Sequence, residues 1–548
     1  MEFKALLFDT RSIQRYIYSS NQLRTNVGAS YLVDQVFDDV LIQVLQGKFG
    51  EGEVDNATWQ ENRPPDWEKM EQKCRIAYIG GGNALVLFKV SVEDKEIGDI
   101  VTEFTKSLLE THPGLRTGAA IGMMRLDSEG HFLDENKEVV KSGDDPRHPL
   151  RQLVVQLKEW QSSVFPETSV PYTGLTQLCP EIGEAATWWD KDKDRFCSLE
   201  IATKRKAGDE VKGYIRNKLQ VADPSGNWEK FFTNYMFPDE LEKLGQKETE
   251  KYIAIVHLDG NNMGERFANC DTLTARKNLS RRLSRKTAKA FASMLRDAVG
   301  EYDDYGTFLD LGANGKKKIL PVRPLVLGGD DMTFICTAKL ALRYTKRVME
   351  AMFDGKDGEE RVDTCAGIAI QPANYPFFRG YMLAEQACDA AKKEMRKLRE
   401  EKKVEKSCWL DFVIRHGEQA PDLSQIREQE YKAAAGDMHF GPYRVDVENA
   451  ASDERALANL IAGLDELKKE NRLAMNKIKG LRGVISKNED ERGKFLQRLR
   501  ESKVGLPNVP AWKDYKETLW KDGRTPYIDL IELLDYYEAE GESVSGKK

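Results

Sequence analysis

Two short apolar runs joined by a glycine turn occur twice in this chain, and this repeated hairpin is the feature that most constrains the fold. The first copy carries Gly80-Gly-Gly-Asn83 at its tip, and the second carries Gly328-Gly-Asp-Asp331. The glycines are expected, because tight turns need residues with positive φ. The two adjacent aspartates are not required by a turn, and only the second copy has them. An internal repeat with this difference predicts a duplicated fold in which one copy holds a chemical site.

The elements around the second hairpin predict a ferredoxin-like domain. Apolar, β-prone runs indicate strands on both sides of Gly328-Gly329 and at 252–258, 363–370 and 408–414. Helical periodicity indicates helices over 272–299, 338–352 and 381–400. The resulting order, βαββαβ with extra pieces, is that of an α+β sheet with helices on one face.

The first 125 residues repeat this order more weakly. The matching elements are a strand at 4–8, a helix near 29–45, a hairpin at 75–88, a helix near 101–110 and a strand at 118–124. Beyond 415 the chain is charged and helical, with one apolar helical face around Leu457–Leu467 after a capping Ser452. We therefore expect four parts: a first ferredoxin-like domain at 1–125, an insert at 126–248, a second ferredoxin-like domain at 249–414 and a helical domain at 415–548.

Composition narrows the class of protein. The net charge of −7 over 548 residues gives no global basic field that would attract nucleic acid or an anionic membrane. No segment approaches the ~20 consecutive apolar residues that a membrane span needs. The first residues, Met1-Glu-Phe-Lys-Ala5, do not resemble a signal peptide. The sequence predicts a cytoplasmic protein without a membrane partner.

Asp259, Asp330 and Asp331 are expected to meet at one edge of the second sheet. Asp259 ends the first strand, and the other two lie between the next two strands, which are neighbours in this topology. Three carboxylates this close repel one another, and divalent cations are the simplest compensation. Hard oxygen ligands favour Mg²⁺ or Mn²⁺. Two such ions, about 3.5–4 Å apart, would activate an attacking 3′-hydroxyl and bind a nucleoside triphosphate.

Two further features are candidate nucleotide contacts. The turn Gly260-Asn261-Asn262-Met263-Gly264 follows the first acid and would bring backbone groups close to phosphate or metal, although Asp-Gly is also a common turn dipeptide. Lys392 would reach a triphosphate as a point charge. A solvated helix lysine beside Lys393 is the alternative interpretation.

A basic stripe lies on the helix that follows the first acid. Lys277, Arg281, Arg285 and Lys289 recur at i,i+4 spacing in a segment, 272–296, that contains no acid. Each like-charge pair costs about 0.2–0.5 kcal/mol in an isolated helix. The stripe predicts a contact with nucleic acid or with an acidic partner surface, and a solvated face is the alternative.

Other site chemistry has little support in the sequence. The six histidines show no His-Asp pair and no H-x-x-x-H spacing, and neither G-x-S-x-G nor a nucleotide P-loop occurs. The eight cysteines contain no C-x-x-C pair. Cys179 and Cys197 are two ligands short of a structural zinc site, so zinc is doubtful and two reduced thiols are the better interpretation.

Several segments resemble the large subunit of type III CRISPR effector complexes. Arg323–Phe334 and His257–Gly264 resemble the second palm domain of that family. The family's first palm domain is similar to three segments, Ile13-Gln14, Leu23-Arg24 and Gly28–Leu32. Its late palm helix is similar to Leu383–Glu385 and Ala391-Lys392. The likeness covers residues 1–410 in order and is most specific around 252–264 and 321–336.

The resemblance implies two palm domains with helical domains, and a synthase that converts ATP into cyclic oligoadenylate messengers in antiviral defence. It implies Asp259, Asp330 and Asp331 as catalytic metal ligands, assisted by the Gly260 carbonyl. It also implies nucleotide contacts at Gly260, Asn261, Asn262, Gly264, Gly328, Gly329 and Lys392. The first palm, with Gly82 and Asn83 in place of the acids, is expected to be non-catalytic.

Two departures from the family pattern matter. The chain opens directly on the first palm, so no histidine-aspartate nuclease activity is expected, and the zinc-binding cysteines between the palms are reduced to Cys179 and Cys197. The resemblance implies guide RNA, target RNA and other CRISPR effector subunits as partners, whereas a stand-alone synthase is the alternative. A cyclase that makes a smaller cyclic nucleotide, and a non-catalytic RNA-binding scaffold, also stay open. An oligomer is compatible with the sequence.

Overall fold

The structure is a computed structural model of the chain. It describes residues 1–539 except for 62, 164–173, 192, 248–250, 356–360, 403, 417–421, 470–474 and 503–504. No helix in these residues is both long and apolar enough to span a membrane.

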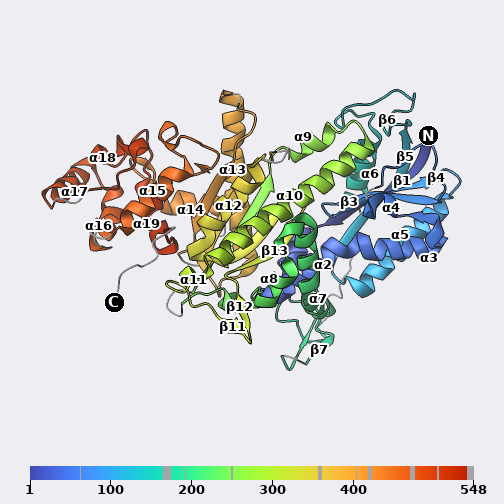
Figure 1. Cartoon of the computed structure of the whole chain (residues 1–548), viewed down its shortest axis with the longest axis horizontal. Helices are drawn as coiled ribbons and strands as arrows, with labels where there is room; N and C mark the ends of the chain where they lie inside the picture. The colour runs from blue at the N-terminus through green and yellow to red at the C-terminus, as the bar shows by residue number, and fades with distance from the viewer. Residues whose placement is uncertain are drawn as a thin grey trace. The chain divides into compact units, whose positions relative to one another are not determined.

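The chain forms two compact units (Figure 1). The first contains Met1–Ser225, Asn262–Ala288 and Leu325–Asp330, and the second contains Gly226–Asn261, Lys289–Pro324 and Asp331–Lys548. The two units therefore alternate along the chain. The four domain boundaries expected from the sequence stay predictions.

The first sheet has six strands in the order β2-β3-β4-β1-β5-β6. Their bounds are β1 Glu2–Arg11, β2 Val54–Asp55, β3 Cys74–Gly80, β4 Asn83–Lys89, β5 Arg116–Leu126 and β6 Phe132–Leu133. Strand β1 lies between β4 and β5 and is antiparallel to both. The inner order β3-β4-β1-β5 is the ferredoxin-like order, so the prediction for this region is confirmed.

Helices cover both faces of the first sheet. The helices of this region are α1 Ile13–Ile17, α2 Leu23–Gln35, the π-helical η1 Val36–Leu41, α3 Ile42–Phe49, α4 Ala57–Gln60, α5 Asp94–Thr111, α6 Pro149–Ser163 and α7 Leu199–Ala222. On one face Phe8 contacts Phe37 of η1 and Phe104 of α5, with ring centroids 6.1 and 4.7 Å away. On the other face Leu7 packs in one cluster with Leu157 of α6. The expectation of helices on one face was wrong, because strands that are apolar on both faces need cover on both.

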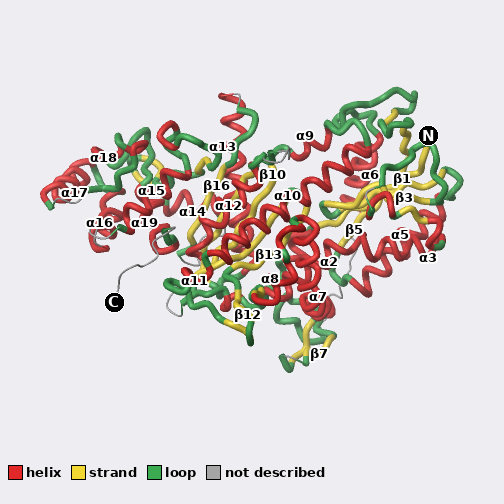
Figure 2. The backbone as a smooth tube through the Cα atoms, viewed as in Figure 1, coloured by secondary structure: helices red, strands yellow, loops and turns green. Residues whose placement is uncertain are grey.

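The second sheet also has six strands, in the order β13-β14-β10-β15-β16-β19 (Figure 2). Their bounds are β10 Tyr252–Gly260, β13 Val322–Gly328, β14 Asp331–Thr337, β15 Thr364–Pro372, β16 Trp409–Ile414 and β19 Tyr443–Arg444. The order β13-β14-β10-β15 repeats that of the first sheet. Strand β16 is an addition that pairs in parallel with β15.

Helices cover both faces of the second sheet as well. On one face Phe334 of β14 contacts Phe291 of α10 (Leu273–Gly300), with ring centroids 6.1 Å apart. On the opposite face α13 (Phe377–Lys402) packs on β15 so closely that a Cβ on Gly367 would collide with the carbonyl oxygen of Ala384. This close approach brings the side chains of α13 to the end of β10.

Other elements of the two units are α8 Trp228–Asn234, α9 Met263–Ala268, α11 Tyr302–Tyr305, α12 Ala341–Phe353, β7 Trp188–Asp190, β8 Arg195–Cys197, β9 Tyr235–Met236, β11 Ala313–Asn314 and β12 Lys317–Ile319.

The C-terminal region is mainly helical. It contains α14 Leu423–Glu430, α15 Leu457–Lys468, α16 Met475–Ile485, α17 Glu489–Glu501, α18 Tyr515–Thr518 and α19 Tyr527–Leu533, with short strands β17 Lys432–Ala433 and β18 Gly436–Asp437. Leu457, Leu460 and Leu464 are buried, as the apolar face predicted. The residue before α15 is Ala456, so the expected cap at Ser452 was wrong; Ser452 ends a separate 3₁₀ turn.

Candidate metal centre

Three aspartates meet at one end of the second sheet. Asp259 lies next to the last residue of β10, Asp330 stands in the turn between β13 and β14, and Asp331 is the first residue of β14. The register pairs Leu258 with Met332, which places Asp259 beside Asp331. One carboxylate oxygen from each aspartate lies within 4.8 Å of the other two. The structure thus brings together the three acids that the sequence predicted.

The donor set of this cluster fits a hard divalent cation. It consists of carboxylate oxygens, the ligands that Mg²⁺ and Mn²⁺ prefer. All three acids are half-buried, so solvent screens their mutual repulsion only in part. Among the residues that the structure describes, this is the one group of three or more acidic, histidine or cysteine side chains placed to share an ion.

The two hairpin turns differ in a way that explains where the acids occur. In the second hairpin only Gly329 of the two-residue loop has positive φ, at 58°, and Thr287 donates to its carbonyl oxygen over 2.7 Å. In the first hairpin both loop residues, Gly81 and Gly82, have positive φ, at 61° and 79°. A Cβ at Gly82 would also collide with Cδ1 of Ile13. An aspartate at the second loop position would therefore have to adopt positive φ in the first hairpin, whereas Asp330 does not in the second.

Lys392 projects from α13 to the cluster. Its Nζ donates to Oδ2 of Asp259, and the two side chains keep 18% and 23% of their exposure. Burial acts to lower the pKa of Lys392, but the charge of Asp259, with Cys388 and Asp389 nearby, outweighs burial and raises it. The ammonium therefore stays charged, and the structure joins the predicted lysine to a predicted metal ligand.

Three side chains near Asp259 were not singled out from the sequence. Glu385 and Asp389 lie seven and three residues before Lys392 on α13, so helical spacing places them along one face. Burial raises the pKa of Glu385, and the charge of Asp389 raises it further. His257 of β10 is buried, which lowers its pKa to about 4, so it is neutral near pH 7. The i,i+4,i+7 spacing from Glu385 to Lys392 was the signal available in the sequence.

The first sheet keeps one acid at the corresponding place. Asp9 of β1 pairs with Asn83 of β4, as Asp259 adjoins Asp331 in the second sheet. Nε2 of Gln161 on α6 donates to Oδ2 of Asp9 over 3.1 Å. Helices α6 and α13 both follow the fourth strand of their ferredoxin-like unit, so Gln161 is the counterpart of Lys392.

The turn after Asp259 is mostly structural. Asn261 is 2% exposed, and its Nδ2 donates to the carbonyl oxygen of Ser407 over 3.1 Å, so its side chain points inward. Asn262 takes a left-handed conformation before α9, with φ 57°. Gly264 lies within α9 and has open space beside its Cα. Gly260 is thus the residue of this segment that directly adjoins the acids, as the last residue of β10.

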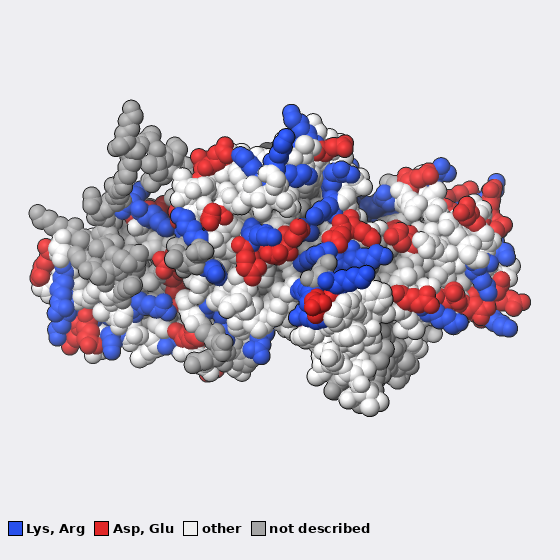
Figure 3. Space-filling model, turned by 90° about the horizontal axis from the view of Figure 1, so that it is seen from below, with Lys and Arg blue, Asp and Glu red and all other residues white. Residues whose placement is uncertain are grey.

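The basic stripe does not form one solvent-facing row. Lys277 is 3% exposed, and its Nζ donates to the carbonyl oxygens of Thr58 and Arg63 over 2.9 and 3.1 Å. Arg281 donates to the carbonyl oxygen of Trp59. These two residues tie α10 to the α4 segment, which corrects their expected role as external contacts. Arg285 is exposed and Lys289 is half-buried. On the face shown in Figure 3, basic and acidic side chains are interspersed.

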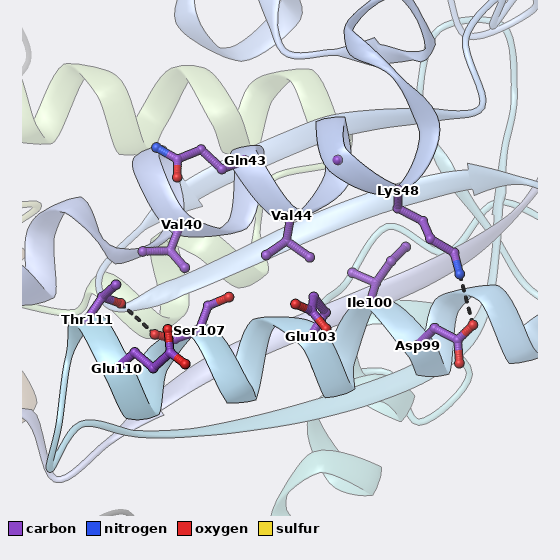
Figure 4. A pocket seen from close by; sticks show the side chains of 11 residues that line it. Val40, Gln43, Val44, Lys48, Asp99, Ile100, Glu103, Ser107, Glu110 and Thr111 are labelled. Atoms are coloured by element: carbon purple, nitrogen blue, oxygen red, sulfur yellow. Dashed lines mark hydrogen bonds and ion pairs between the residues drawn. The ribbon is translucent and has the colours of Figure 1, made fainter.

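Two other candidate sites are formed by residues that are distant in the sequence from the three acids. Cys179 and Cys197 pack in one buried cluster, and burial raises the pKa of Cys197 to about 11. A cavity of about 580 Å³ lies between α3 and α5, with Val44 and Ile100 on its apolar part and the Lys48–Asp99 ion pair, 2.8 Å long, at one end (Figure 4). None of its lining residues was predicted as a site residue.

A family model matches the central part of the chain. Residues 252–399 match the family model described as Cas10/Cmr2, second palm domain. No curated protein matches the sequence.

Similar solved structures cover most of the chain at low identity. A Csm1–Csm4 cassette in complex with pppApApA has 11% identity and a TM-score of 0.49, covering 97% of this chain and 69% of that one. A cassette in complex with cA4 has 12% identity and a TM-score of 0.46, covering 97% and 70%. Csm1 of T. onnurineus has 12% identity and a TM-score of 0.48, covering 97% and 70%.

The resemblance seen in the sequence is thereby confirmed where it was most specific. Strand β10, the aspartate hairpin and the helix that carries Lys392 all fall within the matched residues. Residues 252–399 are similar to the second palm domain of the Cas10/Cmr2 family.

Proposed function

We propose that this protein is a metal-dependent nucleotidyltransferase that converts ATP into a cyclic oligoadenylate or a related cyclic nucleotide in CRISPR-type antiviral defence. The observation that carries the proposal is the convergence of Asp259, Asp330 and Asp331 within a Cas10/Cmr2 palm domain. A purely structural hairpin has no use for three half-buried carboxylates whose oxygens lie within 4.8 Å of one another.

The three aspartates are the residues that would hold one or two Mg²⁺ or Mn²⁺ ions. Bound there, the ions would supply Lewis-acid activation of a 3′-hydroxyl and neutralisation of triphosphate charge. Gly329, with positive φ and open space beside its Cα, leaves room for a nucleotide to approach the turn. Lys392 is the side chain that the family resemblance assigns to the triphosphate. The adenine preference follows from the family resemblance.

The test uses purified full-length protein with each radiolabelled NTP and Mg²⁺ or Mn²⁺, with and without RNA, and mass spectrometry of the products. The Asp330→Ala/Asp331→Ala variant should lower the rate at least about a hundredfold, because charge stabilisation in the transition state is lost. Mn²⁺ should raise the melting temperature of the wild type but not of this variant, since a ligand that binds only the folded state stabilises it.

Asp9→Asn is the matched control, because Asp9 occupies the corresponding place in the sheet that lacks the acid pair. It should leave product formation unchanged. A wild type that makes no product under any condition, including in its native assembly, would favour the alternative function, an RNA-binding scaffold subunit. Guide RNA and other effector subunits are the partners proposed for either function.

A further inference from the structure

The ion pair between Lys392 and Asp259 engages one of the three acids that the proposed function assigns to metal binding. The ammonium and a divalent cation therefore compete for the same carboxylate. We propose that Lys392 is an exchangeable counter-ion, which neutralises Asp259 before the cation binds, leaves it when the cation arrives, and then contacts the triphosphate of the entering nucleotide. This inference rests on the proposed function, because it assumes that the acids bind a divalent cation.

The charge balance around Asp259 favours exchange. Lys392 supplies a positive charge directly at Asp259, because its Nζ donates to Oδ2 of that carboxylate. Once divalent ions occupy the acids, an ammonium on Asp259 adds a like charge beside them, and the ion pair loses its advantage. An incoming triphosphate then offers the ammonium a stronger acceptor.

Helix α13 permits this movement without a backbone shift. The neighbours Ala391 and Met395 are buried, and the helix is packed on β15 at Gly367, so its backbone is held in place. The lysine side chain has a flexible four-carbon stem that can change partners. Asp389, one helical turn earlier on the same face, interacts with Lys392 electrostatically and stays close to the ammonium after it leaves Asp259.

The first sheet shows that the fold itself needs only a hydrogen-bond donor at this place. There Gln161, a neutral amide, donates to Asp9 over 3.1 Å from the corresponding helix. The side chain that donates to the acid is charged in the second sheet and neutral in the first, where Arg11 and Lys158 act on Asp9 only electrostatically. This contrast assigns the charge of Lys392 to the chemistry of the acid cluster rather than to packing of the helix on the sheet.

The test measures how fast an amine-reactive reagent labels Lys392 in the full-length protein, with exposed Lys393 as the internal reference in the same helix. Without metal, Lys392 should react roughly tenfold more slowly than Lys393, because its ammonium is held in the ion pair with Asp259. Saturating Mn²⁺ should abolish most of this protection. A non-hydrolysable ATP analogue added with Mn²⁺ should restore it.

Two variants separate exchange from simple burial. In Asp259→Asn, Lys392 should react quickly with the reagent without metal, and Mn²⁺ should not change its labelling rate. Lys392→Gln should bind Mn²⁺ about fivefold more tightly by calorimetry, because no ammonium has to be displaced. Lys393→Gln is the matched control and should bind Mn²⁺ like the wild type.

The outcomes distinguish this inference from the proposed function. If the protein forms product but Lys392 still reacts slowly with the reagent after Mn²⁺ binds, the exchange is overturned and the proposed function stays intact. Equal labelling of Lys392 and Lys393 without metal would also overturn it. Absence of Mn²⁺ binding together with absence of product would overturn both.

Discussion

At the scale of single residues, His439 is a buried histidine that lies between two carboxylates, outside the acid cluster. It is buried, with Nε2 2.7 Å from Oδ1 of Asp411 and Nδ1 2.9 Å from Oδ1 of Asp529. Both ring nitrogens face carboxylates, so both donate and the ring is an imidazolium. Burial and Arg427 act to lower the pKa of His439, but the two carboxylates outweigh them and raise it.

This histidine predicts a pH-dependent stability. A group with a raised folded-state pKa stabilises the fold fully below its unfolded pKa, about 6.5, and loses that effect as the pH rises through the folded value. Asp411 has a lowered pKa, so its contribution is lost in acid, below about pH 4. The free energy of unfolding should therefore fall as the pH is raised from about 6.5 to 9. Denaturant titrations over this range measure it.

His439→Gln should destabilise the protein by about 3 kcal/mol at pH 6, because it removes the imidazolium that pairs with buried Asp529, whereas Asp411 keeps Arg427 as a partner. It should also flatten the alkaline slope, which is the fall of the free energy of unfolding as the pH rises above about 6.5. His131→Gln, at a half-buried histidine that contacts Asp127, is the control and should preserve the slope. An unchanged alkaline slope in His439→Gln would contradict the assignment.

The sequence could not reveal this cluster. The six histidines showed no neighbouring His-Asp pair, yet His439 meets acids 28 and 90 residues away along the chain. Asp259, Asp330 and Asp331 were predictable because a hairpin and its neighbouring strand fix their proximity from local patterns. Gln161 carried no signal of its own, since only the packing of α6 on β1 brings it to Asp9.

At the scale of elements, glycines decide how closely helices approach strands. Gly367 allows α13 to reach β15, and this contact positions Lys392 beside Asp259. The order of strands and helices in the second half was predicted from periodicity and is confirmed. The helix expected over 29–45 is instead divided into α2, the π-helical η1 and α3. Periodicity also grouped Lys277 with Arg285, because it identifies a shared helix face but not the neighbour that covers it.

Gly367→Ala should destabilise the protein by about 3 kcal/mol, because its Cβ would overlap backbone atoms of α13 that cannot move aside easily. Gly493→Ala is the matched control in exposed helix α17, where nothing lies near the added methyl. It should be neutral or stabilising by up to about 1 kcal/mol, from helix propensity. Chemical denaturation measures both, and equal effects would refute the packing role of Gly367.

At the scale of the whole molecule, the two compact units share the chain in alternating segments. Asn262–Ala288 and Leu325–Asp330 belong to the first unit although their flanking residues belong to the second. Within the first unit, Lys277 and Arg281 bind carbonyl groups of residues 58–63. A cut after Ser225 therefore does not divide the protein into two independent folding parts.

We expect the isolated fragment 226–548 to melt at a lower temperature and to bind a hydrophobic dye, because it retains segments of the first unit without their neighbours. The control is the full chain cleaved at an engineered site after Ser225, in which both pieces are present. Thermal unfolding with dye fluorescence compares the two samples. A fragment as stable as the cleaved full chain would show that the interleaved segments contribute little.

The turn at Gly81-Gly82 has a consequence for how the two halves of this protein diverged. Restoring acids to the first sheet requires Gly82→Asp, which meets both positive φ and Ile13, and also Asn83→Asp. The Gly82→Asp step costs stability before the complete ligand set can return any benefit. A first sheet that carries the acid pair is thus separated from the present one by a less stable intermediate, which in evolutionary terms is a fitness valley.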